Sequence, residues 1–344
     1  MAEPSELLAQ WSVSHGNLRR FFEDLALPPL DEQAQRAAGE AAAAAAIEET
    51  FGIKLEEFAL GVDSVGGAFA TAGRRKLTTP DPAVPQDEGA AAFFDVDNTL
   101  IQGSSLILLA EELAKRRFIT LREFLPALTK QIRFRVSGSE SPEDIAAGRE
   151  QALGLVRGKS VAELQALCKD IVERQMLSKA YTSTIDLAAM HIAAGQQVWL
   201  VSATPVQIGQ ALAERLGFTG ALGTVAEEKN GLFTGRLVGD ILHGPGKQHA
   251  VAALAAIQRL DLDKCTAYSD SINDLPMLEM VGSPVAINPD RALRRHAQAQ
   301  GWAIRDYRSV RRLARSYALP VLVAAGIAGG ATWAARRRRG YRAG

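Results

Sequence analysis

The chain has 344 residues, of which 47% are hydrophobic, and its 39 basic and 39 acidic residues balance to zero net charge. This length suits about two domains of ordinary size, and the neutral balance argues against a nucleic-acid partner. Two distant cysteines, Cys168 and Cys265, lack metal-ligand spacing, so we expect a reducing compartment and no disulfide framework.

Residues 1–88 are predicted to form an N-terminal helical extension followed by a linker. The alanine-rich run from Gln33 to Phe51 predicts a helix that ends at Gly52, and the proline-rich run from Thr78 to Pro85 predicts the linker. No residue pattern here carries recognisable chemistry, so we expect a solvated arm or a regulatory extension. The N-terminus lacks the basic and then apolar pattern of a signal peptide.

Two acidic residues, Asp95 and Asp97, directly follow the apolar run from Ala90 to Phe94. In a strand, residues two apart face the same way, so both carboxylates would share one side. Two carboxylates about 4 Å apart repel by roughly 4 kcal/mol at an effective dielectric constant of about 20. The pair therefore suits a nucleophile beside a proton shuttle, with a metal ion between them. The alternative is a strand that merely happens to end in Asp-x-Asp.

Helical patterns alone fill the chain from 103 to 181, which makes this stretch an insert after the first strand. We expect helices near 106–117, 121–136, 142–156 and 160–176. An insert at this point would lie over the carboxyl ends of the strands, where ligands usually bind in such sheets.

Strands and helices then alternate, which predicts a parallel sheet covered by helices. The expected strands lie at 197–201, 222–227, 232–239, 264–268, 284–287 and 302–305, and the expected helices at 205–216, 246–258 and 273–280. The strands 222–227 and 232–239 are predicted to pair as a hairpin around Asn230-Gly231.

Further polar signals follow the later strands. Ser202 ends a strand just before a helix, where its hydroxyl suits either a phosphate oxygen or a simple helix cap. Lys247 lies where a loop enters a helix, and is either a phosphate ligand or a solvated side chain. The run Asp270-Ser271-Ile272-Asn273-Asp274 sets two acids and an amide close together, which turn formation alone explains poorly.

The chain thus has four motifs in order: Asp95 to Thr99, Ser202, Lys247, and Asp270 to Asp274. Together they resemble the motifs of the haloacid dehalogenase (HAD) superfamily of phosphohydrolases, in subclass IB, which contains phosphoserine phosphatase. The resemblance implies an α/β fold in which a Rossmann-like parallel sheet forms the catalytic core over 89–102 and 182–307. It also implies a helical-bundle cap over 103–181. On this resemblance we expect an enzyme, a phosphatase that hydrolyses phosphoric monoesters.

The resemblance implies roles for the motif residues. Asp95 would attack phosphorus to form an aspartyl-phosphate, and Asp97 would protonate the leaving oxygen and then activate water. The phosphoryl oxygens would be held by Ser202, Lys247 and Asn273.

The same resemblance implies a Mg²⁺ cofactor. Its ligands would be Asp95, Asp270 and the backbone carbonyl of Asp97, and oxygen ligands of this kind favour Mg²⁺. Asp274 would support the site by orienting Lys247 or the metal shell.

One position departs from the family pattern. The phosphoserine enzymes of this subclass place a glutamate nine residues after the nucleophile, where this chain has Ser104. We therefore expect phosphoserine to be a poor substrate, and favour a small organic phosphate or a lipid headgroup phosphate. The lipid option rests on similar domains fused to lysophosphatidate acyltransferases. The alternatives are a phosphotransferase of the same chemistry and a non-catalytic membrane-tethered adaptor.

Residues 308–344 are predicted to form an arginine-flanked C-terminal hydrophobic helix. The run from Ser316 to Ala335 has no charged residue over 20 positions. Five arginines between positions 305 and 315 precede it, and five arginines between positions 336 and 342 follow it. A spanning anchor, a surface-lying helix and a buried core helix remain alternatives. The first predicts a membrane-associated protein with its catalytic domain in the cytoplasm. Gly326 and Gly330 hint at helix pairing, so a homodimer stays open.

Overall fold

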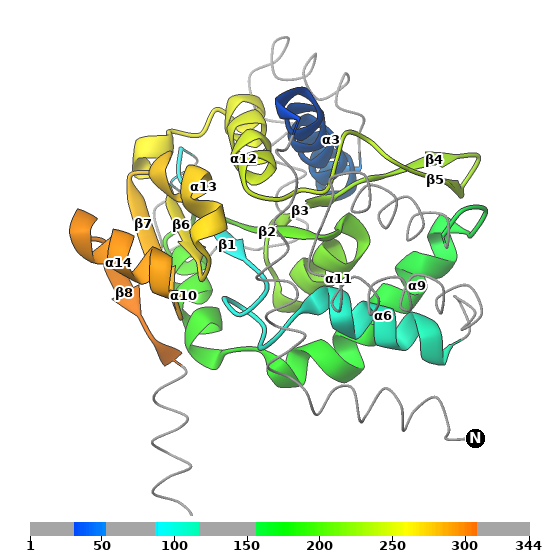
Figure 1. The fold of residues 1–344 in the computed structure, drawn as a ribbon, viewed down its shortest axis with the longest axis horizontal. Helices are drawn as coiled ribbons and strands as arrows, with labels where there is room; N and C mark the ends of the chain where they lie inside the picture. The colour runs from blue at the N-terminus through cyan, green and yellow to red at the C-terminus, as the bar shows by residue number, and fades with distance from the viewer. Residues whose placement is uncertain (1–30, 53–86, 88, 117–155, 308–344) are drawn as a thin grey trace, which may run out of the picture.

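Six parallel strands form the central sheet of the computed structural model, which describes residues 31–52, 87, 89–116 and 156–307 (Figure 1). Their order across the sheet is β3-β2-β1-β6-β7-β8. The strands are β1 (Ala91–Asp95), β2 (Gln197–Pro205), β3 (Gly220–Thr224), β6 (Thr266–Ser269), β7 (Ser283–Ile287) and β8 (Ala303–Arg305). Every neighbouring pair is parallel, which confirms the predicted α/β fold with a parallel sheet.

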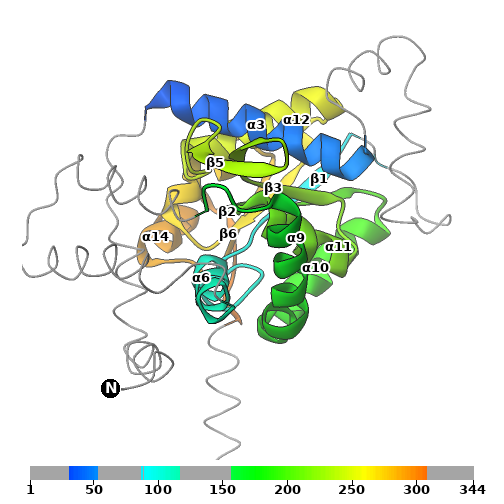
Figure 2. The ribbon, with the colours of Figure 1, turned by 90° about the vertical axis from the view of Figure 1, so that its right-hand side faces the viewer.

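Helices cover both faces of this sheet. They are α3 (Glu32–Phe51), α6 (Ser105–Lys115), α9 (Val161–Ile171), α10 (Thr182–Ala193), α11 (Val206–Leu216), α12 (Pro245–Gln258), α13 (Leu275–Glu279) and α14 (Arg291–Gln300). Figure 2 shows α3 and α12 on one side of the sheet and α9, α10 and α11 on the other. Helices α10 and α14 occupy two stretches for which the sequence predicts no element.

Strand β1 is buried along its whole length, and its side chains alternate between two hydrophobic cores. Ala92 and Phe94 pack on the side of α10 and α11, whereas Ala91 and Phe93 pack on the side of α3 and α12. This continuous apolar run is typical of a strand buried on both faces. It places Asp95 at the carboxyl end of the central strand.

The described part of the insert after β1 is helical, as predicted. Helix α6 opens it, and α9 continues into a π turn at Val172–Met176 and a 3-10 turn at Leu177–Lys179. The helices predicted near 121–136 and 142–156 lie outside the described residues.

The predicted hairpin is correct in its turn and wrong in its first strand. Asn230 and Gly231 have positive φ angles of 55° and 74° and connect β4 (Ala226–Lys229) to β5 (Leu232–Leu237). The first part of the predicted strand, residues 222–224, instead belongs to β3, which pairs with β2 in the main sheet. All five residues of β3 are buried, so they complete the core rather than an exposed hairpin.

The N-terminal helix α3 begins and ends almost where predicted, with Asp31 as its N-cap and Gly52 in the left-handed conformation after it. It is not a solvated arm, however. Ala42, Ala43 and Ile47 are fully buried, and the helix packs against α12 and β3. Alanine on one face allows two helix backbones to approach closely. Because alanine is only weakly apolar, the sequence lacks the stripe of large apolar residues that would predict a buried face.

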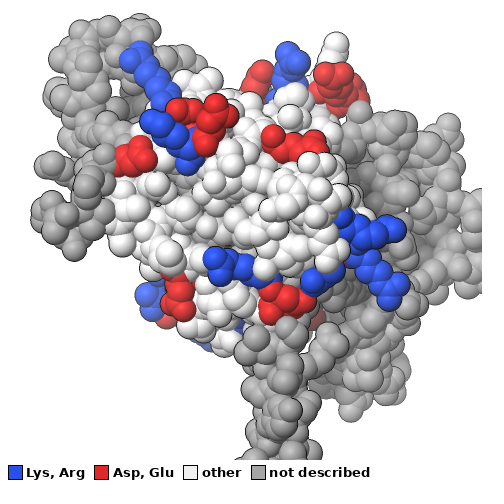
Figure 3. Space-filling view, turned by 90° about the vertical axis from the view of Figure 1, so that its left-hand side faces the viewer, with Lys and Arg blue, Asp and Glu red and all other residues white. Residues whose placement is uncertain are grey.

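The predicted tail at 308–344 lies outside the described residues. Within the ranges that are described, none of the helices combines the length and the apolar character needed to cross a bilayer. On the face toward α14 and β8, shown in Figure 3, acidic and basic side chains of the described part are interspersed with uncharged surface.

Candidate active site

Three neighbouring strands bring the predicted catalytic residues to one edge of the sheet. Asp95 pairs with Val201 in β2, and Phe94 pairs with Tyr268 in β6. Ser202 follows Val201, and Asp270 follows the last residue of β6. Because the strands are parallel, their carboxyl ends lie together, and so do these residues.

Lys247 comes to this edge from the first turn of α12. Its Nζ donates to Asp95 Oδ1 at 2.6 Å and to Asp274 Oδ2 at 2.8 Å. All three residues are buried, with exposed fractions of 4% for Lys247, 5% for Asp95 and 2% for Asp274. The structure thus joins three residues that the sequence assigns to one site, although 152 positions separate Lys247 from Asp95.

Burial and the neighbouring charges shift the pKa values of Asp95 and Lys247. Burial raises the pKa of Asp95 to about 7; Lys247 opposes this rise, and Asp274 and Asp97 add to it. Burial alone would lower the pKa of Lys247, but its two carboxylate partners outweigh this effect, so its pKa lies above the ordinary value. Lys247 therefore stays positively charged at neutral pH.

Asp97 is half-buried beside Asp95, and its Oδ1 accepts hydrogen bonds from Ser105 N at 2.9 Å and from Ser105 Oγ. Burial raises the pKa of Asp97, and the bonds from Ser105 oppose that rise. A carboxyl group with a raised pKa suits proton donation and acceptance. Ser105 is not among the residues predicted from the sequence, and its place at the start of an apolar helix is the signal that points to it.

The remaining predicted residues lie around this centre. Ser202 is 3% exposed, and its Oγ is 2.8 Å from Thr204 Oγ1. Strand β2 continues past the predicted end at 201 to Pro205, so Ser202 lies within the strand and does not cap α11. Asn273 is exposed at the rim, in a short 3-10 turn. Ser269, which the sequence analysis passes over, donates from Oγ to Asp274 Oδ2 at 2.7 Å and so fixes the partner of Lys247.

The loop after β7 holds both acidic loops in place. Asn288 Nδ2 donates to the Asn98 carbonyl at 3.0 Å, which braces the turn after Asp97. Asp290 N donates to the Asp270 carbonyl at 2.8 Å, and Asp290 Oδ2 accepts from Ile272 N at 2.8 Å. No local sequence pattern pointed to these contacts.

The donor set fits a hard divalent cation. Asp95, Asp97, Asp270 and Asp274 bring four carboxyl groups to one edge against the single ammonium group of Lys247. Such an excess disfavours a phosphate anion unless a cation balances it. Over the described part of the chain, no three His, Cys, Asp or Glu side chains form a preassembled metal cluster. This is compatible with the expected ligands, since only two of them are side-chain carboxylates.

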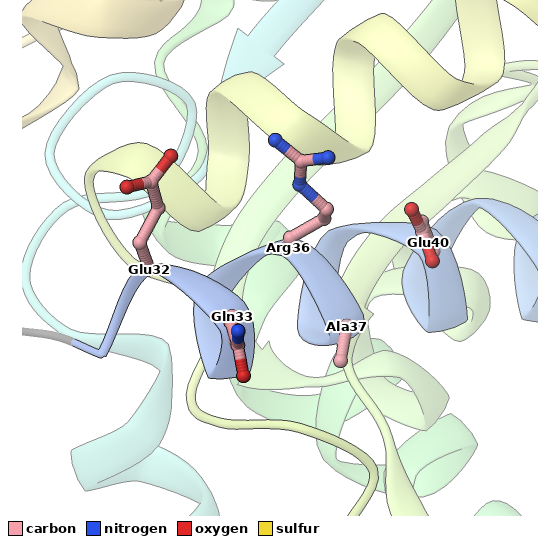
Figure 4. Close-up of a pocket in the computed structure, with 5 residues that line it drawn as sticks. All are labelled: Glu32, Gln33, Arg36, Ala37 and Glu40. Atoms are coloured by element: carbon pink, nitrogen blue, oxygen red, sulfur yellow. The ribbon is translucent and has the colours of Figure 1, made fainter.

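A separate hollow of about 500 Å³ lies along α3 and is lined by Glu32, Gln33, Arg36, Ala37 and Glu40 (Figure 4). None of these residues belongs to the catalytic edge, and the hollow is not part of the candidate site.

Comparisons with known proteins agree with the geometry. Residues 92–279 match the model of the haloacid dehalogenase-like hydrolases. The chain is 52% identical over 259 residues to a protein named phosphoserine phosphatase SerB1 from Mycobacterium tuberculosis, which covers 75% of this chain and 84% of that protein. It is 28% identical to a histidinol-phosphatase of Neisseria meningitidis, over 63% of this chain and 98% of that protein.

One solved structure is similar in both sequence and fold. It is a protein of unknown function from Bordetella pertussis, 30% identical with a TM-score of 0.55, and the match covers 63% of this chain and 98% of that one.

Proposed function

Since this chain belongs to the haloacid dehalogenase-like hydrolases and is a phosphatase, we propose that it cleaves phosphate monoesters through a covalent aspartyl-phosphate formed on Asp95. The observation that carries the proposal is the buried group in which Lys247 bridges Asp95 and Asp274 at the end of β1. A carboxylate nucleophile held by a charged lysine is what an attack on an anionic phosphoryl group requires.

The reaction proceeds in two steps. A carboxylate oxygen of Asp95 bonds to phosphorus while the ester oxygen leaves with a proton from Asp97. Asp97 then takes a proton from a water molecule that attacks the same phosphorus, the bond between Asp95 and phosphorus breaks, and inorganic phosphate is released. Lys247, Ser202 and Asn273 hold phosphoryl oxygens in both steps. The hydrogen bonds from Ser105 support the exchange of roles at Asp97 by keeping its carboxyl group in one orientation.

Mg²⁺ is the proposed cofactor, held by Asp95, Asp270 and the backbone carbonyl of Asp97, with Asn273 and Asp274 completing the surroundings. When bound, it supplies positive charge that offsets the clustered carboxylates and the phosphoryl oxygens.

The substrate is proposed to be a small organic phosphate, with a lipid headgroup phosphate as the second option. Phosphate release from a generic ester such as p-nitrophenyl phosphate tests the enzyme against the adaptor, which would release none. Added alcohol separates the phosphotransferase, because a transferase would convert the alcohol to a phosphate ester at the expense of free phosphate. A panel of phosphorylated metabolites and lipids then ranks the substrates.

Phosphoserine is a specific case, because the similarity to a protein named phosphoserine phosphatase favours it and Ser104 disfavours it. A hydroxyl carries no negative charge to pair with the substrate ammonium as a glutamate carboxylate would, a loss of about 1.5–3 kcal/mol, or roughly ten- to a hundredfold. We expect kcat/KM for phosphoserine to fall below that for esters without an amine.

The variant Ser104→Glu checks the cause. We expect it to raise the preference for phosphoserine over an amine-free ester, measured as a ratio of kcat/KM values, whereas Ser104→Gln should leave that ratio unchanged. A wild-type protein that prefers phosphoserine to every other ester would contradict the expectation.

The tail prediction concerns membrane binding. We expect the full-length protein to sediment with membranes and a version ending after Tyr307 to be soluble and active. The cut belongs after Tyr307 because its N–H donates to Asn288 Oδ1 at 2.7 Å. High salt should release a surface helix held by arginines but not a spanning one. A full-length protein that stays in the soluble fraction at low salt would leave only the core-helix alternative.

A further inference from the structure

Helix α3 lies outside the family match at 92–279, yet it packs directly against α12, whose first turn carries Lys247. Figures 1 and 2 both show the two helices side by side. A helix that precedes the family match therefore contacts α12. Among the described residues, Lys247 of α12 is the only lysine whose side chain reaches the carboxyl end of β1. The details of this contact indicate what it does.

Two glycines bring the backbones into contact. A Cβ on Gly39 of α3 would lie 2.5 Å from His249 Cβ and 2.6 Å from Ala250 N, both in α12. A Cβ on Gly239, in the loop before α12, would lie 2.3 Å from Ala38 N. Gly239 also has a φ of 78°, which favours glycine. Because backbone meets backbone here, α3 cannot shift without moving this loop and α12.

Gln35 adds a polar link at the same place. Its side chain is fully buried, and Nε2 donates to Asp240 Oδ2 at 3.2 Å and to the Ile241 carbonyl at 3.4 Å. Its Oε1 lies against Gly246, where a Cβ would approach it to 2.4 Å. One side chain thus contacts both ends of the segment 240–246, and Lys247 is the next residue.

We propose that α3 is a positioning element for the phosphate-binding site and that Gln35 is its positioning residue. Gln35 fixes the segment 240–246, which sets the first turn of α12 and hence the place of Lys247 Nζ between Asp95 and Asp274. The inference rests on the role proposed above for Lys247. A misplacement of about 1 Å at a catalytic group can reduce the rate about a hundredfold, so a contact one residue away from Lys247 is enough to matter.

An exchange of hydrogen-bond partners tests the proposal. Gln35→Glu places a carboxylate against Asp240, and we expect it to lower kcat/KM on a generic ester about tenfold or more and to weaken competitive inhibition by inorganic phosphate. In the double variant Gln35→Glu with Asp240→Asn, the amide lies on the loop and the carboxylate on α3. This restores the hydrogen bond to residue 240 with donor and acceptor exchanged, whereas the bond to the Ile241 carbonyl stays lost. Both quantities should therefore recover partly, to at least about threefold above those of Gln35→Glu.

Thr50→Val is the matched control. Thr50 lies at the other end of α3, about 22 Å along the helix from Gln35, and donates to the Thr219 carbonyl at 3.4 Å. We expect this variant to lower the melting temperature without changing kcat/KM or phosphate inhibition. Gln35→Met, which has a similar length and no amide, serves if Gln35→Glu does not fold, and should weaken phosphate inhibition in the same direction.

The outcomes are distinct when Lys247→Ala is measured in parallel. If Lys247→Ala is inactive but Gln35→Glu and Gln35→Met behave as wild type, the role of α3 is refuted and the proposed function stands. The same holds if the double variant is no better than Gln35→Glu. If Lys247→Ala keeps wild-type activity, the proposed role of Lys247 itself has failed.

Discussion

Asparagine in place of Asp95 should reduce phosphate release at least about a thousandfold, because an amide cannot form the aspartyl-phosphate. The fold should persist, since the amide oxygen can still accept the hydrogen bond from Lys247 Nζ. Steady-state turnover of a generic ester measures the loss. Asp97→Asn should slow both chemical steps and serves as the companion variant. Substantial turnover by a purified Asp95→Asn protein would rule out Asp95 as the nucleophile.

Stability gives an independent check on the same substitution. Burial raises the pKa of Asp95 from 3.8 to about 7, so between these values the metal-free folded state holds a proton that the unfolded state has lost. The free energy of unfolding contributed by Asp95 is therefore highest below pH 4 and falls as the pH rises toward 7. In Asp95→Asn this contribution should disappear, which denaturant unfolding at several pH values would reveal. An unchanged pH dependence would contradict the raised pKa.

Removal of Mg²⁺ should have a comparably large effect. A chelator should stop turnover and added Mg²⁺ should restore it, because the clustered carboxylates otherwise repel a phosphate anion. Protons and Mg²⁺ would compete for Asp95, whose pKa is about 7. The apparent affinity for Mg²⁺ should thus be level above pH 7 and weaken about tenfold for each pH unit below it. Calorimetric titration at several pH values measures this slope.

Two results would contradict these expectations, the first for the metal requirement and the second for Asp95 as a ligand with a raised pKa. One is full turnover in excess chelator once metal removal has been verified by elemental analysis. The other is an affinity for Mg²⁺ that does not change between pH 5 and 8. Ca²⁺ is a useful comparison, since it also prefers oxygen ligands but demands more of them at longer distances.

Local patterns in the sequence predicted those parts of the site that local geometry determines. Asp95 follows a run of buried apolar residues, so its place at a strand end can be read directly. Asn230-Gly231 likewise predicts its own turn, because both residues adopt positive φ. Lys247 joins Asp95 only after the chain has crossed the sheet, and the family resemblance rather than spacing supplied that pairing.

The features that could not be predicted from the sequence depend on contacts between residues far apart in the chain. Strand β3 consists mostly of small residues and pairs in parallel with β2, which no short-range pattern specifies. Ser105 and Ser269 are single hydroxyls of the kind that occur throughout any surface. The burial of α3 depends on Gly39 meeting His249 and Ala250, and neither side of this contact is informative without the other.

The packing of α3 on α12 also has a consequence for synthesis. The chain emerges from the ribosome N-terminus first, and about 200 residues separate the end of α3 from the end of α12, which at roughly 5–20 residues per second takes about 10–40 s. During that interval the alanine face of α3 has no α12 to cover it. The nascent chain thus exposes its earliest described helix until one of its later helices is made, and pulse-labelled chains should become resistant to protease at α3 only after residue 258 has left the ribosome.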